Sequence, residues 1–466
     1  MRASELALLK KTSYEHSVLS SLWDTLPTHL CAFSRHFQSR THSQADHAAR
    51  YLRCLVTTER NFGNIERMNE SVGEDDYQGL HHFISSSVWD RFPLMTQIGQ
   101  ELSDLFLSKS GEVSLQLDES AHLKKGKSSV GVGRQYAGLT GKVDNCQVGV
   151  YASLVKDTDF CLINSRIYLP KSWTNDPERC KKAGIPLANR SYKTKPQLAL
   201  EMVKEASEAG IGFDWVGGDS IYGNSPDLID WLDQTSTKFV LDVSSDRHLY
   251  LKEPQLVPPP KSKGRGRPAK HPKIEGTSVS LIDYAEGLDK KQWQQVKIRK
   301  TAKGWLKSWV HVVKVWVVPR KTTQIKCRTL ILRKLPGRKK ELKCSFSNFS
   351  IETTSMRKLV WMQGQRHFIE QSFRTAKKEL GLSDYQVRKW HAWHRHSAMV
   401  MLAMLFIVKQ KLVHKIRHPL TSMGDIRKLS QALIEGNHEQ YQRRFMQMSK
   451  RHRKRKADID RYYRDG

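Results

Sequence analysis

The chain has 466 residues, and its 78 Lys and Arg against 47 Asp and Glu give a formal net charge of +31. This length suggests about three domains at roughly 150 residues each. The excess of cations indicates a polyanionic partner, because clustered Lys and Arg neutralise phosphates and release bound counterions. Hydrophobic residues make up 38% of the chain, which argues against extended disorder.

No membrane-spanning helix and no secretory signal are predicted. The longest purely apolar run, 398–408, is about half of the roughly 20 residues that a spanning helix needs, so we expect a buried core helix there. Lys10 and Lys11 interrupt the first apolar stretch, which is unlike a signal peptide. The seven cysteines contain no Cys-x-x-Cys pair and are typical of reduced thiols. We therefore expect a cytoplasmic protein that associates with the nucleoid and not with a membrane.

Residues 1–108 show helical periodicity with Ser- and Asp-rich caps. A helical N-terminal module on a basic chain is typical of a helix-turn-helix-like DNA reader. A packed helical cap explains the same pattern. We favour a DNA-binding domain because of the charge of the whole chain.

An α/β sheet is predicted over 109–250, the first part of a core. Strict alternation begins at Val113 and places Asp118 on the polar face of a strand, while Glu119 should point to the opposite face. Asp219 lies at the end of a later strand in the sequence FDWVGGDS. Other strands and helices are predicted at 145–155, 160–169, 195–210, 225–234 and 238–244. In such a sheet, site residues gather at strand ends.

Residues 251–350 are predicted to form a basic linker and an inserted all-β domain. The Pro-, Gly- and Lys-rich stretch 252–275 is not expected to fold, whereas about 277–350 carries Val, Ile and Trp at strand frequencies. Within the linker, Arg265 and Arg267 belong to a cationic run that resembles an AT-hook, whose Arg side chains enter a narrow A·T minor groove. A solvated linker is the alternative.

Helical periodicity returns at 354, and we predict a second part of the core at 351–411 and a basic helical tail at 412–466. In the tail, six of the seven residues at 450–456 are Lys or Arg. This run fits a non-specific DNA-binding tail and a solvated basic end equally well.

The stretch 361–381 is predicted to be one helix that carries a carboxylate among three cations. At about 100° per residue, Arg366 and Arg374 lie about 40° either side of Glu370, and Lys377 lies about 20° away. A solvated face with ordinary ion pairs explains the same pattern. The other two acids favour a site, because carboxylate oxygens bind hard divalent cations and two such ions can clamp the attacking and leaving oxygens of a phosphoryl transfer.

The order Asp118, Asp219, Glu370 resembles the DDE transposases of cut-and-paste insertion sequences. Their signature around the glutamate, Y-x2-R-x3-E-x6-K, is matched by Arg366, Glu370 and Lys377, while Gln363 stands at the tyrosine position. The segments LDESAHLKKGKSSVGVGRQYAG, GGDSIYG and GLSDYQVRKWHAWHRH look like the same group, and the resemblance runs from about 55 to 411.

This resemblance implies a ribonuclease-H-like mixed sheet flanked by helices and interrupted by a β insertion. It implies that Asp118, Asp219 and Glu370 are catalytic and bind Mg²⁺ or Mn²⁺, and that Arg366, Arg374 and Lys377 contact DNA. The expected partners are the terminal inverted repeats and target DNA, bound by a homodimer, and the expected reactions are hydrolysis and transesterification. A catalytically inactive or domesticated DNA-binding descendant is the alternative, and a nuclease that cuts without joining is a second one.

Overall fold

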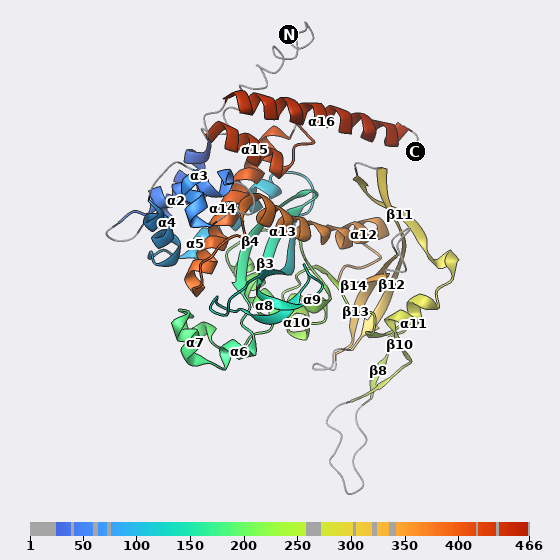
Figure 1. The fold of residues 1–466 in the computed structure, drawn as a ribbon. Helices are drawn as coiled ribbons and strands as arrows, with labels where there is room; N and C mark the ends of the chain where they lie inside the picture. The colour runs from blue at the N-terminus through green and yellow to red at the C-terminus, as the bar shows by residue number, and fades with distance from the viewer. Residues whose placement is uncertain are drawn as a thin grey trace.

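The computed structural model confirms a mixed α/β fold in which helices flank one large sheet (Figure 1). It describes residues 25–38, 42–58, 64–71, 76–257, 272–301, 304–318, 324–334, 342–415, 418–434 and 438–464. The longer strands are β1 (Ser114–Leu123), β2 (Gly133–Ala137), β3 (Lys142–Lys156), β4 (Asp159–Ile167), β11 (Gln294–Thr301), β12 (Gly304–Val317), β13 (Lys326–Lys334) and β14 (Leu342–Ser347). The shorter ones are β5 (Trp215–Gly218), β6 (Phe239–Asp242), β7 (His248–Tyr250), β8 (Gln255–Val257), β9 (Lys273–Glu275) and β10 (Ser278–Ser280).

The helices fall into an N-terminal group, a central group and a C-terminal group. The N-terminal group is α2 (Ala45–Thr57), α3 (Ile65–Ser71), α4 (Tyr77–Ser85) and α5 (Arg91–Leu107). The central group is α6 (Lys171–Thr174), α7 (Pro177–Lys182), α8 (Lys195–Glu208), α9 (Ser220–Gly223), α10 (Pro226–Gln234) and α11 (Leu281–Glu286). The C-terminal group is α12 (Met356–Gln365), α13 (His367–Leu380), α14 (Trp390–His414), α15 (Met423–Ile434) and α16 (His438–Arg464).

The central strands lie in the order β4–β3–β1–β5–β6. β3 is antiparallel to both β1 and β4, whereas β5 is parallel to β1 and β6 is parallel to β5. This is the mixed sheet of a ribonuclease-H-like core, and the strands predicted at 145–155 and 160–169 correspond to β3 and β4. Parallel pairing of β1 and β5 places the carboxyl end of β5 beside the middle of β1, and site residues are expected at such a strand end.

Helix α14 is the buried centre of the helical layer. It is the one helix in the described part of the chain that is long and apolar enough to cross a membrane, and 83% of that apolar window is buried inside the protein. The burial confirms the core helix predicted at 398–408. Tyr51 of α2 bonds His396 of α14 at 2.8 Å, and Arg395 donates to the backbone oxygens of Ile84 and Trp89. The N-terminal helices therefore pack on the same core, while their contact with DNA stays a prediction.

The β-rich block continues the central sheet. β14 pairs antiparallel with β6, and β13, β12 and β11 follow outward from it. One sheet thus runs from the core into the predicted insertion. The proposed domain boundaries stay predictions.

Two expectations about local structure were wrong. The ends of the basic connector do fold, because β8 and β9 form an antiparallel pair. Arg265 and Arg267 lie outside the described residues. The single helix expected over 361–381 is two helices, since α12 ends before Arg366 and α13 begins after it. Arg366 keeps a helical backbone conformation at this junction, so the spacing of Arg366 and Glu370 is preserved.

Candidate functional site

Asp118 and Asp219 meet because their strands are parallel neighbours. Leu117 of β1 lies opposite Gly218, the last residue of β5, and the next residue in each segment is an aspartate. Asp219 ends its strand and caps α9, its carboxylate accepting the N–H of Ile221 at 2.9 Å. Ligand oxygens of Asp118, Glu119 and Asp219 all lie within 4.8 Å of one another.

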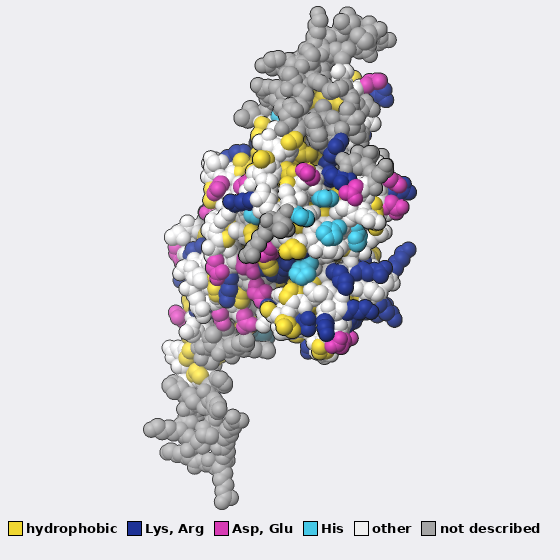
Figure 2. All heavy atoms as spheres, turned by 90° about the vertical axis from the view of Figure 1, so that its left-hand side faces the viewer, with side chains coloured by type: hydrophobic (Ala, Val, Ile, Leu, Met, Phe, Trp, Pro, Cys, Tyr) yellow, Lys and Arg dark blue, Asp and Glu magenta, His cyan; other side chains and the backbone are white. Residues whose placement is uncertain are grey.

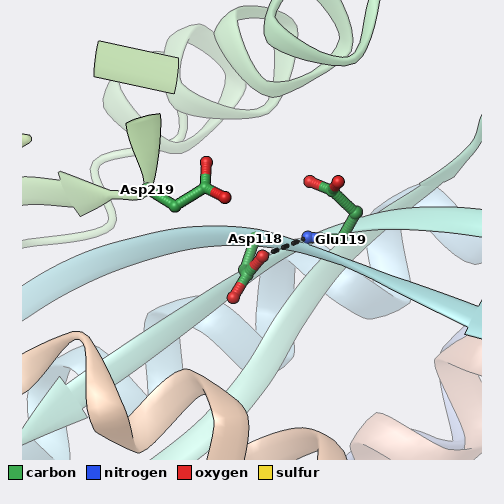
Figure 3. A group of neighbouring side chains, drawn as sticks. All are labelled: Asp118, Glu119 and Asp219. Carbon is green, nitrogen blue, oxygen red and sulfur yellow. Dashed lines mark hydrogen bonds between the residues drawn. The ribbon is translucent and has the colours of Figure 1, made fainter. Parts of the chain in front are cut away.

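Glu119 is the acid that sequence reasoning set aside. The side chains of Asp118 and Glu119 leave β1 on opposite sides, as the alternation predicts, and the carboxylates of Glu119 and Asp219 face each other (Figure 3). Glu119 accepts hydrogen bonds from Lys195 at 2.8 Å and Tyr222 at 2.9 Å. Alternation favoured Asp118 over Glu119 because it considers one strand alone. It ignores the neighbouring strand β5, from whose end Asp219 approaches the face that carries Glu119.

The sequence GGDSIYG lets the backbone approach closely around Asp219. A Cβ on Gly223 would lie 1.9 Å from the backbone oxygen of Asp242 in β6. A Cβ on Gly217 would lie 2.3 Å from the side-chain oxygen of Gln116. The first contact is with backbone, which cannot move aside without shifting a strand, so only glycine fits at position 223.

Burial sets the charge state of the two aspartates. Burial, opposed by the Arg366 guanidinium and reinforced by the carboxylates of Asp219 and Glu119, raises the pKa of Asp118 to about 7. Burial, followed by Glu119, also raises the pKa of Asp219. These carboxylates repel one another in a poorly solvated place, and a bound cation relieves both effects. All the grouped ligand atoms are carboxylate oxygens, which fit a hard divalent cation.

Glu370 lies outside this group of ligand atoms in the described structure. Its carboxylate accepts a hydrogen bond from Arg366 at 2.9 Å, and its side chain is 51% exposed. His367 and Arg366 together lower the pKa of Glu370 despite partial burial. Arg366 also faces Asp118, Asp219 and Asp242, whose charges raise its pKa against the effect of burial. The guanidinium therefore links Glu370 to the two aspartates.

The remaining predicted site residues occupy different surroundings. Lys377 donates to the backbone oxygen of Ala121 in β1 at 2.7 Å, and burial lowers its pKa to about 8. Arg374 is exposed on α13. Gln363, at the tyrosine position, is buried and donates to Ser345 at 2.8 Å. Lys377 thus fastens α13 to the strand that carries Asp118.

Positive charge is unevenly distributed over the surface. On the face in Figure 2, Lys and Arg side chains gather toward the right-hand side below a group of histidines, whereas Asp and Glu are frequent on the left. A surface of this kind favours a polyanion on one side of the molecule.

Comparison with known proteins agrees with this geometry. A family model described as "DDE superfamily endonuclease" matches residues 32–305, which include β1, β5 and both aspartates but not Glu370. The probable transposase for insertion sequence element IS701 from Microchaete diplosiphon is 31% identical over 209 residues. That match covers 44% of this chain and 50% of the relative, so it spans about half the length of that protein. The chain belongs to the DDE superfamily endonucleases.

Proposed function

We propose that the chain is a DNA transposase that cleaves transposon ends and joins them to target DNA. The observation that carries the proposal is the placement of Asp118, in the middle of β1, beside Asp219 at the end of the neighbouring strand β5, with ligand oxygens within 4.8 Å of each other and of Glu119. Family membership and the similarity to a probable insertion-sequence transposase support the same class of reaction.

In this proposal Asp118, Asp219 and Glu370 are the catalytic acids and hold Mg²⁺ or Mn²⁺. When bound, these ions polarise the phosphodiester and activate water or a DNA 3′-hydroxyl for in-line attack. Arg366 balances the charge of the acids from the α12–α13 junction. Lys377 holds α13 against β1 through its hydrogen bond to Ala121. Because Glu370 is also in α13, this contact keeps Glu370 near the strand that carries Asp118.

The proposed partner is double-stranded DNA, both terminal inverted repeats and target. In this proposal Arg366, Arg374 and Lys377 contact DNA phosphates, and Arg265 and Arg267 of the connector do so as well. We also propose a homodimer on DNA, since two ends must be cut and joined together, and a cytoplasmic, nucleoid-associated location. Mass photometry on paired ends tests the dimer, and a complex with only one chain for two ends contradicts it.

The test is a cleavage and joining assay with purified protein and the duplex borders of its own gene. We expect nicked and joined products with Mg²⁺ or Mn²⁺ and none in EDTA. Glu370→Gln should bind the borders but form neither product, whereas Glu208→Gln, an exposed acid on α8, should behave as wild type. Nicks without joined products contradict the transposase and indicate a nuclease. Binding with neither product for wild type indicates a DNA-binding descendant.

A further inference from the structure

Helix α16 is anchored on α15 at its N-terminal end. Tyr441, Phe445 and Met448 are buried in one cluster with Leu429 and Ala432 of α15. Their spacing places them on one stripe of the helix. This hydrophobic contact fixes where α16 begins relative to the core.

The other end of α16 is anchored on the β11–β12 hairpin. The hydroxyl of Tyr463 donates to the backbone oxygen of Thr301 at 3.1 Å and accepts its N–H at 3.2 Å. The ring of Tyr463 also lies edge-on to Trp305, with centroids 6.2 Å apart. Figure 1 shows α16 running from α15 toward the tip of this hairpin.

Between the two anchors, α16 is exposed on every side over residues 453–457. The inward stripe of Tyr441, Phe445 and Met448 continues to His452 and then stops, because all residues at 453–457 are exposed. Arg453, Lys454 and Arg455 point in three directions about 100° apart. In the described part of the chain none of these three forms an ion pair, whereas Arg451 pairs with Asp425 and Lys456 with Asp460.

A second group of cations lies at the hairpin anchor. Lys297, Lys300 and Arg357 lie 5.8, 5.7 and 5.8 Å from the centroid of the Trp305 ring. All three are exposed, and within the described residues none has a carboxylate partner. The exposed cations of α16 are therefore followed, at the end of the helix, by a second group of cations around Trp305, whose ring contacts Tyr463.

We propose that this basic bridge, formed by Arg453, Lys454, Arg455, Lys297, Lys300 and Arg357, binds the phosphate backbone of duplex DNA. From Arg453 to Tyr463 the helix covers about 15 Å at about 1.5 Å per residue, which matches four to five phosphates of one strand at about 3.4 Å each. Unpaired cations in a fixed array repel one another, and a polyanion relieves that repulsion. Contact is with the backbone alone, so it does not depend on base sequence.

The inference takes DNA as the partner from the proposed function, but its test does not need cleavage. Binding of a duplex of the gene's border and of an unrelated duplex is measured by fluorescence anisotropy in EDTA over a salt series. The bridge variant is Arg453→Gln/Lys454→Gln/Arg455→Gln, in which Gln keeps helix propensity at exposed positions. The matched control is Lys181→Gln/Lys182→Gln/Lys291→Gln, which removes three exposed cations from α7 and from the short 3-10 helix Lys290–Gln292 before β11.

The bridge variant should lower the slope of log Kd against log salt by about one per lost contact, about three in all, and equally for both duplexes. The control should lower it by less than about one. Equal slopes for wild type and bridge variant overturn the proposal. An unchanged slope together with a loss of dimer in mass photometry also overturns it, and assigns the bridge to a second copy of the chain. If the wild type cleaves but the bridge variant keeps the wild-type slope, only this inference fails. If the bridge variant loses slope as expected but the wild type never cleaves, only the proposed function fails.

Discussion

Replacing the most buried acid of the site should stabilise the protein when no divalent cation is present. The pKa of Asp118 rises from 3.8 to about 7 in the folded chain. The folded state therefore holds the proton more tightly than the unfolded state, and it loses this advantage as pH rises from about 4 to about 7. A shift of about three pKa units corresponds to on the order of 4 kcal/mol. Asp118→Asn removes the titration, so its gain in unfolding free energy should be near zero at pH 4 and reach that order at pH 8.

The assay is urea unfolding in EDTA at several pH values, beside Asp246→Asn, which changes an exposed acid in a loop. The exposed variant should show no such pH-dependent gain. Adding Mg²⁺ should stabilise wild type and have little effect on Asp118→Asn, since a bound cation offsets the repulsion. A gain for Asp118→Asn that is the same at pH 5 and pH 8 refutes the reasoning from burial.

Three other changes test the surroundings of the site. Arg366→Gln leaves the carboxylates facing it without their cation, and it should lower the free energy of unfolding by about 3–5 kcal/mol in EDTA, less with Mg²⁺; equal losses in both buffers contradict this. Gly223→Ala should cost about 1–3 kcal/mol, because its Cβ would lie 1.9 Å from the Asp242 backbone oxygen, and an unaltered melting temperature would show that the strand end yields freely. Tyr222→Phe removes the hydroxyl that donates to Glu119 at 2.9 Å, with an expected loss of about 1–3 kcal/mol in urea unfolding, while a neutral result means that water replaces the hydroxyl.

The sequence was sufficient to locate the two aspartates. Alternation placed Asp118 on one face of a strand, and the end of a short apolar run placed Asp219 at a strand terminus. Both signals are local, since they depend on the two-residue period of a strand and on where it stops. The burial of helix α14 could also be predicted from the sequence, because an apolar run of that length is typical of a core helix.

Features that depend on pairing between distant segments could not be predicted. The approach of Asp219 to Glu119 follows from the parallel register of β1 and β5, which residue spacing does not encode. Likewise, the pairing of β14 with β6 merges the insertion with the core sheet. The break at Arg366 has no Pro or Gly at that position as a signal.

The most direct test of the proposed function is an excision assay in cells, with a marker flanked by the borders of the chain's own gene. Wild type, Asp118→Asn, Asp219→Asn and Glu370→Gln are compared, with border binding measured for each. We predict excision by wild type and none by the three variants, although all four bind. Excision by any of these variants at the wild-type level contradicts the assignment of that acid, and no excision by bound wild type contradicts the transposase itself.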